Sequence, residues 1–529
     1  MGDYLNPGND GFQQIINDIY VDKTGLIAYI NDTIGKPRPL TCFSRPRRFG
    51  KSFAAKMLCA YYDKSCDSRL LFEGLSISKS ESFEKHLNKY DVIYLDITWF
   101  ISTTPDIEHV VNDLQKKVIT DLKENFGDIA DIRETSLPRM LSHIAGKTGK
   151  KFIIIIDEWD ALFREAKENT RLQEEYVQLL RGLFKGGVTT DRMIAAAYMT
   201  GILPIKKYGT ESALTDFREY TMVDPLNLSE YIGFTGEEVE NLCNQYNLDF
   251  DQMKQWYDGY SFSDISSVYS PNSVINAVHF RKIKGYWPTS GTYESLKNYI
   301  SMNFDGLKDA IVTMLGGEGV RVRTERFQND MTSFRSRDDV LTLLIHLGYL
   351  AYDEHSKTVS IPNLEVADIF RDAVDDDTWG EIGKALSRSE ELLNATIQKD
   401  SHAVENALEK IHNSDISVLQ YNDENSLSCA VTLAYYTARN YYEIVRELPT
   451  GKGFADLAFL PYRNTDKPAL LVELKYSKSA DSAIQQIKNN RYDGPLKKYF
   501  GSLLLVGINY EKNARGENAK KHTCIIEKA

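Results

Sequence analysis

Long hydrophobic runs are missing from this sequence. No stretch of about 18 apolar residues occurs, so the chain offers no candidate transmembrane helix. Its first residues, MGDYLNPGNDGF, lack the basic and then apolar pattern of a secretion signal, and Asn6 stands where N-myristoylation expects Ser or Thr. We therefore expect no membrane partner and a cytoplasmic location.

Cysteine is scarce, and its six positions are scattered: Cys42, Cys59, Cys66, Cys243, Cys429 and Cys524. None forms a C-x-x-C pair, which argues against a zinc site or a disulfide framework and indicates reduced thiols. Positive charge is also in the minority, with 63 Lys and Arg against 75 Asp and Glu and a net charge of −12. This balance excludes a globally basic coat for nucleic acid, but it leaves room for a local basic cleft.

The chain is too long for one hydrophobic core. Its 529 residues are 42% apolar and 26% charged, which is ordinary for a globular protein, and they contain no internal repeat or low-complexity tract. Changes of pattern along the sequence predict three domains, at residues 1–222, 223–400 and 401–529.

The first of these domains alternates short apolar runs with segments of helix length. The runs cover residues 39–44, 91–98, 151–158 and 193–202. Near-continuous apolar strands that alternate with helices are typical of a buried, mostly parallel sheet. We therefore expect an α/β domain.

A candidate phosphate-binding loop follows the first strand, in CFSRPRRFGKSFAAKML. Gly50 can approach a phosphate, Lys51 can reach the β and γ phosphates of ATP, and the hydroxyl of Ser52 can bind Mg²⁺. The usual pattern is G-x-x-x-x-G-K-[ST], and Arg45 stands where its first Gly would be. Pro46 is expected to make the turn in place of that Gly.

Two further arginines of this loop leave three interpretations open. Arg47 and Arg48 can contact the phosphates of the nucleotide, reach a neighbouring subunit, or form a solvated rim. We favour contact with the nucleotide.

An acidic pair supports the nucleotide site. The apolar run FIIIIDEWD ends in Asp157 and Glu158, and a buried carboxylate is costly unless it is paired or functional. We expect Asp157 to hold Mg²⁺ through water, Glu158 to polarise the attacking water, and Thr200, at the end of run 193–202, to sense the γ-phosphate. The alternative is an α/β domain with an ordinary glycine turn.

The middle region contains a helix, a hairpin and a second helix, in DDVLTLLIHLGYLAYDEHSKTVSIPNLEVADIF. This order is typical of a winged helix. A hairpin that packs on helices without touching nucleic acid explains the pattern equally well. Residues 383–412 are amphipathic and are interpreted as a connector.

The third domain carries a candidate metal-dependent site. Asp456 lies in the strand FADLAFL, and Glu473 and Lys475 lie two residues apart in LLVELK, so they share a face of the next strand. Asp456 and Glu473 could hold Mg²⁺ beside a phosphodiester, with Lys475 near the attacking water. The alternative is a surface E-x-K pair on an edge strand. Residues 471–521 contain ten Lys and Arg and five Asp and Glu, a local charge of +5 that suits a phosphate backbone.

Several motifs together resemble the bacterial AAA-ATPase-like family, whose members commonly carry a C-terminal nuclease-like domain of the PD-(D/E)xK superfamily. The motifs are YVDKT (20–24), SRPRRFGKS (44–52), DEWD (157–160), TGILPI (200–205) and WYDGY (256–260). The resemblance covers nearly the whole chain and includes the RPRRFGKS form of the loop; Trp159 replaces the Tyr usual in the family. It implies binding of ATP and Mg²⁺ and an αβββαβ nuclease-like domain.

Residues outside the main motifs receive weaker assignments. Gln486 and Tyr492 match a Gln and a Tyr that recur in the nuclease-like superfamily, and Glu424 or Glu447 could add a carboxylate. Further candidates for the nucleotide site are Asp22 and Lys23, which could close over it, and Arg218, which could sense the γ-phosphate. WYDGY is expected to pack at a helix–turn junction.

Three functions remain to be weighed. The favoured one is an ATP-regulated nuclease acting on nucleic acid, with DNA the favoured kind and a homo-oligomer possible. The alternative is a nucleotide-controlled signalling or assembly switch whose nuclease-like domain only binds a partner. A remodelling motor ranks last, because it would need an arginine finger supplied in trans that the sequence does not reveal.

Overall fold

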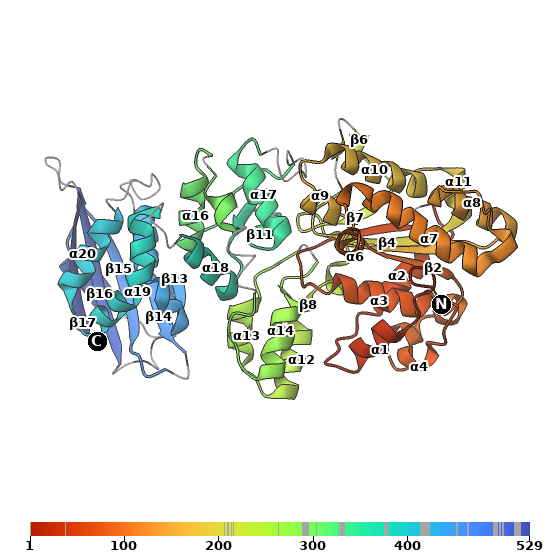
Figure 1. The fold of residues 1–529 in the computed structure, drawn as a ribbon. Coiled ribbons are helices and arrows are strands. Elements are labelled where there is room, and N and C mark those ends of the chain that lie inside the picture. The colour runs from red at the N-terminus through yellow and green to blue at the C-terminus, as the bar shows by residue number, and fades with distance from the viewer. Residues whose placement is uncertain are drawn as a thin grey trace. The chain divides into compact units, whose positions relative to one another are not determined.

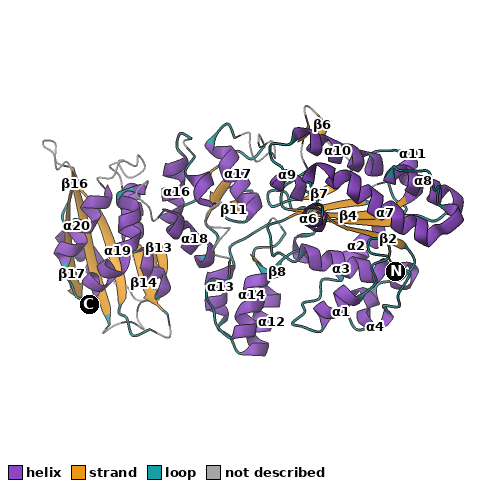
Figure 2. Cartoon of the chain, in the orientation of Figure 1, coloured by secondary structure: helices purple, strands orange, loops and turns teal. Residues whose placement is uncertain are grey.

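A computed structural model describes most of the chain. The described residues are 2–37, 39–205, 207–208, 211–212, 214, 216–262, 264–287, 296–302, 304–325, 327, 334–374, 379–412, 424–450, 453–462, 465–489, 496, 499, 502–512 and 520–529. They form two compact units (Figures 1 and 2). The first unit comprises Met1–Tyr286 and Arg321–Asn363, and the second comprises Trp287–Val320 and Leu364–Ala529. The three-domain division made from the sequence stays a prediction.

The first unit is built on a five-stranded parallel sheet of order β2-β3-β4-β1-β7. Its strands are β1 (Leu40–Ser44), β2 (Asp91–Asp96), β3 (Phe152–Asp157), β4 (Ile194–Gly201) and β7 (Arg218–Tyr220). The helices between and around them are α1 (Asp10–Ile16), α2 (Gly25–Thr33), α3 (Lys51–Tyr62), α4 (Arg69–Phe72), α5 (Phe83–His86), α6 (Ile97–Thr103), α7 (Val110–Phe126), α8 (Leu137–Thr148), α9 (Ala161–Glu165), α10 (Thr170–Phe184) and α11 (Val188–Met193). The expected α/β class with a buried parallel sheet is confirmed.

The sheet is apolar on both faces because helices cover both (Figure 1). All six residues of β3 are buried. Phe152, Ile154 and Ile156 lie in one core cluster with side chains of α7, α8 and α10. Ile153 and Ile155 alternate with them and therefore face the opposite side, where α3 packs on β3. This packing leaves the carboxyl ends of the strands as the edge at which polar side chains gather.

The rest of the first unit is mostly helical. It contains α12 (Gly236–Tyr246), α13 (Phe250–Tyr257), α14 (Pro271–Phe280), α17 (Arg337–Leu347), and the short strands β5 (Lys207–Tyr208), β6 (Glu211–Ser212), β8 (Phe234–Thr235), β9 (Val268–Tyr269), β11 (Ala351–Asp353) and β12 (Thr358–Ser360). Helix α17 ends at Gly348, whose φ of +86° closes the helix in the left-handed region. An antiparallel hairpin of β11 and β12 follows it, so the predicted helix and hairpin are present.

WYDGY forms the junction that its sequence predicted. Tyr257 is the last residue of α13 and donates its hydroxyl to Lys284 O at 2.6 Å. Gly259 adopts φ +107°, and a Cβ at this position would lie 1.9 Å from Pro362 O. Asn363 donates to Asp258 O at 2.7 Å. The segment therefore joins α13 to the end of the hairpin region through backbone contacts that only glycine permits.

The second unit is built on a mixed sheet of order β13-β14-β15-β16-β17. Its strands are β13 (Tyr442–Thr450), β14 (Gly453–Pro461), β15 (Ala469–Tyr476), β16 (Leu503–Lys512) and β17 (Lys520–Lys528). Along the sequence, the chain passes from the second unit to the first within the short strand β10 (Val320–Arg321). Its helices are α16 (Leu307–Leu315), α18 (Leu364–Val374), α19 (Glu381–Ile397), α20 (Ser401–His412), α22 (Glu424–Ala434) and α23 (Ala480–Asn489).

The order α22, three strands, α23 and strand confirms the expected αβββαβ arrangement, and β17 adds a strand that was not expected. Only β15 and β16 are parallel; the other neighbours are antiparallel. The predicted connector folds as α19 and α20, and α20 packs on β17, where Glu405 accepts the N–H of Cys524 at 2.8 Å. Among the helices of the described part of the chain, none is long and apolar enough to cross a membrane.

Gly259→Ala is expected to destabilise the first unit by at least about 2 kcal/mol, because the added methyl group meets the Pro362 carbonyl and the backbone conformation disfavours any side chain. Thermal unfolding followed by circular dichroism measures the effect. The control is Gly285→Ala, since a Cβ at Gly285 meets no atom within 4 Å. Equal midpoints for the two variants would contradict the packing described for WYDGY.

Candidate functional site

The segment RPRRFGKS forms a tight loop between β1 and α3. Arg48 and Gly50 adopt φ values of +73° and +90°, so the chain turns through the left-handed region twice before α3 begins at Lys51. Lys51 is 3% exposed, and its Nζ donates to Pro46 O at 2.8 Å across the loop. Burial lowers the pKa of Lys51, and the nearby carboxylates of Glu158 and Asp157 oppose that shift.

Arg45 does not lie on the surface of this loop, as a charged replacement for glycine would suggest; its side chain is fully buried. Its Nη1 donates to Thr221 O at 3.0 Å, and its guanidinium lies 4.3 Å from the ring centre of Phe262. Its Nε and Nη2 have no hydrogen-bond partner among the described residues. Burial lowers the pKa of Arg45 to about 9. The first position of the motif is therefore occupied by a buried arginine that fixes the loop to Thr221 and Phe262.

A second layer packs against the loop from the helical part of the same unit. The rings of Phe49 and Tyr260 meet edge to face, with centroids 5.4 Å apart. Tyr260 in turn donates its hydroxyl to Gly348 O, at the end of α17, at 2.6 Å. His346 of α17 is buried, and burial and the charge of Arg45 lower its pKa to about 3. WYDGY thus connects the loop to α17.

The predicted acidic pair lies at the carboxyl end of β3, beside the loop. Asp157 is 3% exposed and accepts hydrogen bonds from the hydroxyls of Thr200 and, at 3.4 Å, Tyr94. Burial raises the pKa of Asp157, while hydrogen bonds from Thr200 and Ser52 act in the opposite direction. Burial disfavours the charged form of the Asp157 carboxylate, and a divalent cation bound by Ser52 and Asp157 would stabilise that form. The residues present therefore fit a divalent cation.

Glu158 is held by two cations. Arg164 of α9 pairs with its Oε2, and Lys51 Nζ lies 3.8 Å from its Oε1. Arg164 is buried, and its Nε lies 3.4 Å from Oδ2 of Asp160, which also accepts the backbone N–H groups of Ile202 and Leu203. The sequence reasoning missed Arg164 and Asp160, although their i, i+4 spacing in DEWDALFRE is a recognisable ion-pair signal.

The remaining candidates make contacts that their predicted roles did not include. Arg47 and Arg48 are exposed, and Arg48 donates to Tyr286 O at 3.4 Å. Asp22 accepts the hydroxyls of Thr24 and Ser76, both at 2.6 Å.

Lys23 pairs with Glu238 of α12 at 2.6 Å. Arg218 is exposed on β7, opposite Thr41 near the start of β1, and donates to the hydroxyl of Tyr29 at 3.2 Å. These contacts give Asp22, Lys23 and Arg218 structural partners, and their predicted roles at the nucleotide site stay predictions.

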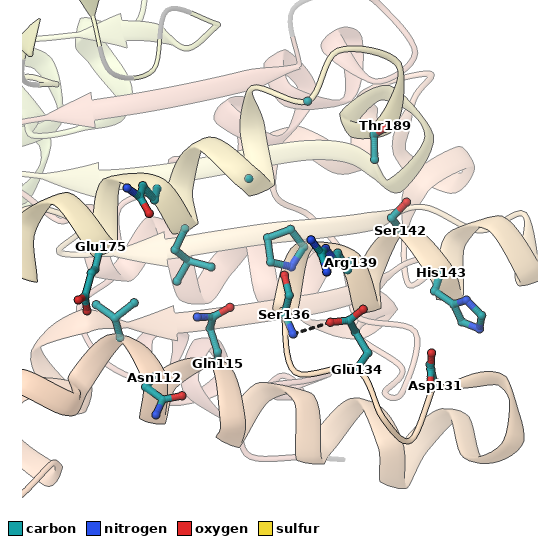
Figure 3. Close-up of a pocket in the computed structure, with 16 residues that line it drawn as sticks. Asn112, Gln115, Asp131, Glu134, Ser136, Arg139, Ser142, His143, Glu175 and Thr189 are labelled. Carbon is teal, nitrogen blue, oxygen red and sulfur yellow. Dashed lines mark hydrogen bonds between the residues drawn. The ribbon is translucent and has the colours of Figure 1, made fainter.

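A separate hollow of about 820 Å³ opens among α7, α8, α10 and α11 (Figure 3). Several of its polar groups already serve the fold: Glu134 accepts the N–H of Ser136 at 2.8 Å, and Gln115 accepts that of Leu137 at 3.2 Å. None of the residues predicted to bind nucleotide lines it. This hollow is therefore separate from the candidate nucleotide site at the strand edge beside Lys51.

In the second unit, Asp456, Glu473 and Lys475 come together as the spacing predicted. In the β14–β15 register Leu457 pairs with Val472, which are the neighbours of Asp456 and Glu473 in sequence, and Asp456 accepts the N–H of Leu474 at 2.6 Å. Lys475 Nζ donates to Glu473 Oε1 at 2.7 Å, so the two side chains share a face. Gln486 of α23, which matches the recurrent Gln of the superfamily, donates to the same oxygen.

This pair of carboxylates fits a metal ion in part. Glu473 is 1% exposed, burial raises its pKa, and its Oε2 has no hydrogen-bond partner among the described residues. Asp456 supplies a second carboxylate. Glu447 is exposed, the side chain of Glu424 and all of Tyr492 lie outside the described residues, and the described part of the chain contains no group of three or more potential metal ligands.

Gly507 was also missed by sequence reasoning. It pairs with Glu473 in the β15–β16 register, and a Cβ there would lie 2.6 Å from Ala480 O and 2.9 Å from Ile484 Cγ1. Its lack of a side chain therefore lets α23 approach the sheet, which brings Gln486 within reach of Glu473.

Two protein families match this chain. Residues 7–210 match the AAA-ATPase-like family, described as a predicted AAA-ATPase, and residues 422–519 match the PD-(D/E)XK nuclease superfamily. The chain thus combines an AAA-ATPase-like domain with a PD-(D/E)XK superfamily domain, which confirms the architecture that the motifs implied. No curated protein matches it.

Several solved structures resemble the chain at about 10% sequence identity over the part that they match. ORC2 of Aeropyrum pernix, in ADPNP–ADP complexes, is 9% identical over 68% of this chain and 96% of its own, with a TM-score of 0.30. CDC6P of Pyrobaculum aerophilum is 10% identical over 66% of this chain and 92% of its own, with a TM-score of 0.24. PCH-2 of C. elegans is 10% identical over 64% and 70%, with a TM-score of 0.21.

Arg45→Gly, which restores the usual glycine of the motif, is expected to destabilise the first unit by about 2–4 kcal/mol, because it leaves a cavity and frees the Thr221 carbonyl. Arg45→Met, which keeps volume without a buried charge, is expected to cost less. The thermal unfolding midpoint measures both effects. The control is Arg47→Gly at the neighbouring exposed position, and a similar midpoint for Arg45→Gly and this control would refute the anchoring role.

Proposed function

We propose that this chain hydrolyses ATP at the edge of the parallel sheet and uses the nucleotide state to control a Mg²⁺-dependent nuclease-like domain that acts on nucleic acid. One observation carries the first part of the proposal: Lys51, Asp157, Glu158 and Thr200, which come from three separate segments of the sequence, form one contact network at the carboxyl ends of β3 and β4. The match of residues 7–210 to the AAA-ATPase-like family supports it.

In this proposal each side chain has a distinct task. Lys51 gives up its hydrogen bond to Pro46 O and donates to the phosphate oxygens instead. The N–H groups at the start of α3 bind the same phosphate. Ser52 and Asp157 would hold Mg²⁺, which neutralises charge on the phosphates. Glu158 accepts a hydrogen bond from the attacking water, and Thr200, bonded to Asp157 and to the Glu158 N–H, reads the position of the γ-phosphate.

The second part of the proposal concerns the second unit. Asp456 and Glu473 would bind Mg²⁺ beside a phosphodiester, and Lys475 would orient or activate the attacking water. The buried Oε2 of Glu473 without a partner among the described residues, and the match of residues 422–519 to a nuclease superfamily, support this assignment. The excess positive charge in residues 471–521 suits a nucleic-acid backbone.

A nucleotide-controlled switch is the second candidate. Both oxygens of Glu158 face cations, an arrangement that favours slow hydrolysis and a long-lived ATP state. Glu473 Oε1 is likewise engaged by Lys475 and Gln486. In a switch, the PD-(D/E)XK-like domain would bind a partner without cutting it.

Lys51→Ala is expected to weaken ATP binding by roughly 10- to 100-fold, because it removes a charge-assisted hydrogen bond to phosphate. Glu158→Gln is expected to retain binding and to lower turnover by roughly 100-fold or more. Calorimetry with MgATP and a phosphate-release assay measure the two quantities. Lys150→Ala, at an exposed lysine, is the matched control. Normal ATP affinity in Lys51→Ala would remove the proposed nucleotide site.

Lys475→Ala is expected to lower cleavage of plasmid DNA or single-stranded RNA by roughly 100-fold or more, since it removes the cation that faces Glu473. The assay is run with Mg²⁺, with and without ATP, on the full chain. Lys478→Ala, at an exposed lysine on the same segment, controls for loss of surface charge. Equal background cleavage by wild type and Lys475→Ala would reject the nuclease and favour the switch.

A further inference from the structure

Arg164 lies at the centre of a buried chain of charges that the nucleotide motifs do not include. Its side chain is 6% exposed and contacts two carboxylates: Nη2 pairs with Glu158 Oε2, and Nε faces Asp160 Oδ2 at 3.4 Å. Asp160 is fixed from the other side by the backbone N–H groups of Ile202 and Leu203, at 3.1 and 2.9 Å. Arg164 is thus held in place, through Asp160, by the backbone that directly follows β4.

Backbone and side-chain contacts hold Glu158 in place, as they do Arg164. Its φ of +53° lies in the left-handed region, and its N–H donates to the Thr200 hydroxyl at 3.2 Å. Its two carboxylate oxygens face different cations, Lys51 at Oε1 and Arg164 at Oε2. Four charged side chains surround this carboxylate, and all of them belong to the same edge of the sheet: Lys51, Asp157, Asp160 and Arg164.

These contacts have different consequences when ATP binds. Lys51 leaves Glu158 for the phosphates in the proposed function, which frees Oε1. The contact with Arg164 involves no group that the nucleotide displaces, because Arg164 is anchored by Asp160. An oxygen that accepts a hydrogen bond from a guanidinium is a poorer acceptor for a proton from water.

We infer that Arg164 is a positioning residue that restrains Glu158 and sets the rate of ATP hydrolysis. Once Lys51 has left Oε1, the remaining hydrogen bond from Arg164 to Oε2 keeps the basicity of the carboxylate low, and its loss makes Glu158 a better acceptor for a proton of the attacking water. This inference rests on the proposed hydrolysis of ATP, and it assigns the slow step to one ion pair within the chain.

The test compares Arg164→Gln and Arg164→Lys with the wild-type full chain, in phosphate release at saturating MgATP. Arg164→Gln is expected to raise kcat by roughly tenfold, the equivalent of one lost charge-assisted hydrogen bond, with KM changed less than about threefold. Arg164→Lys keeps a cation beside Asp160 and is expected to give an intermediate kcat. It also covers the case in which the glutamine variant does not fold.

The matched control is Arg171→Gln, which removes an exposed Arg–Glu pair on α10 and is expected to leave kcat unchanged. A folded Arg164 variant with unchanged or lower kcat would overturn the restraint, whereas the proposed function stands if wild-type turnover is lost in Lys51→Ala. Absence of turnover that depends on Lys51 in both wild type and Arg164→Gln would overturn the proposed function and the restraint together.

Discussion

The parallel sheet of the first unit forces charged groups into a nearly dry environment, and the structure depends on how these charges are paired. The strands are buried on both faces, so polar side chains gather at the ends of the strands, and the carboxyl ends carry most of the predicted site. Asp157, Glu158 and Asp160 meet there, together with Lys51 and Arg164. A buried charge without a partner costs several kcal/mol, so each of these groups constrains its neighbours. The same pairing that stabilises the edge also decides which carboxylate oxygens are available for chemistry.

Packing around the loop before α3 follows a similar logic. A loop that binds phosphate must keep its N–H groups aimed at one point, and most such loops rely on glycine for the turn. Here a buried guanidinium, an aromatic contact and a tyrosine hydroxyl hold the loop instead. These contacts come from residues 221–348, so the loop is supported by the part of the unit that follows the sheet in sequence. The candidate phosphate-binding loop and the helix–hairpin region are therefore parts of one packed structure.

The sequence allowed the main strands to be placed within a few residues, because continuous apolar runs leave little freedom once a sheet is covered on both faces. Strand β7 was missed because it is three residues long and two of them are charged; it is a strand only through its pairing with β1. Strand β17 was missed because KKHTCIIEK has lysines at its start and end. Asp456, Glu473 and Lys475 could be placed together from a spacing of two and a hairpin. The burial of Arg45 could not be predicted from the sequence, because its hydrogen-bond partner Thr221 is more than 170 residues away in the chain.

Gly507 shows how a site can depend on a residue that has no chemistry of its own. It carries no charge and touches no substrate, yet the close approach of α23 to β16 requires that it lack a side chain. A single methyl group there would push away the helix that carries Gln486 and leave Glu473 with one hydrogen-bond donor fewer. Relatives that keep every acidic and basic residue of the site but carry a larger residue at this position would therefore have a complete motif and a misplaced carboxylate. The motif alone would then predict a nuclease, although such a protein would bind nucleic acid without cutting it.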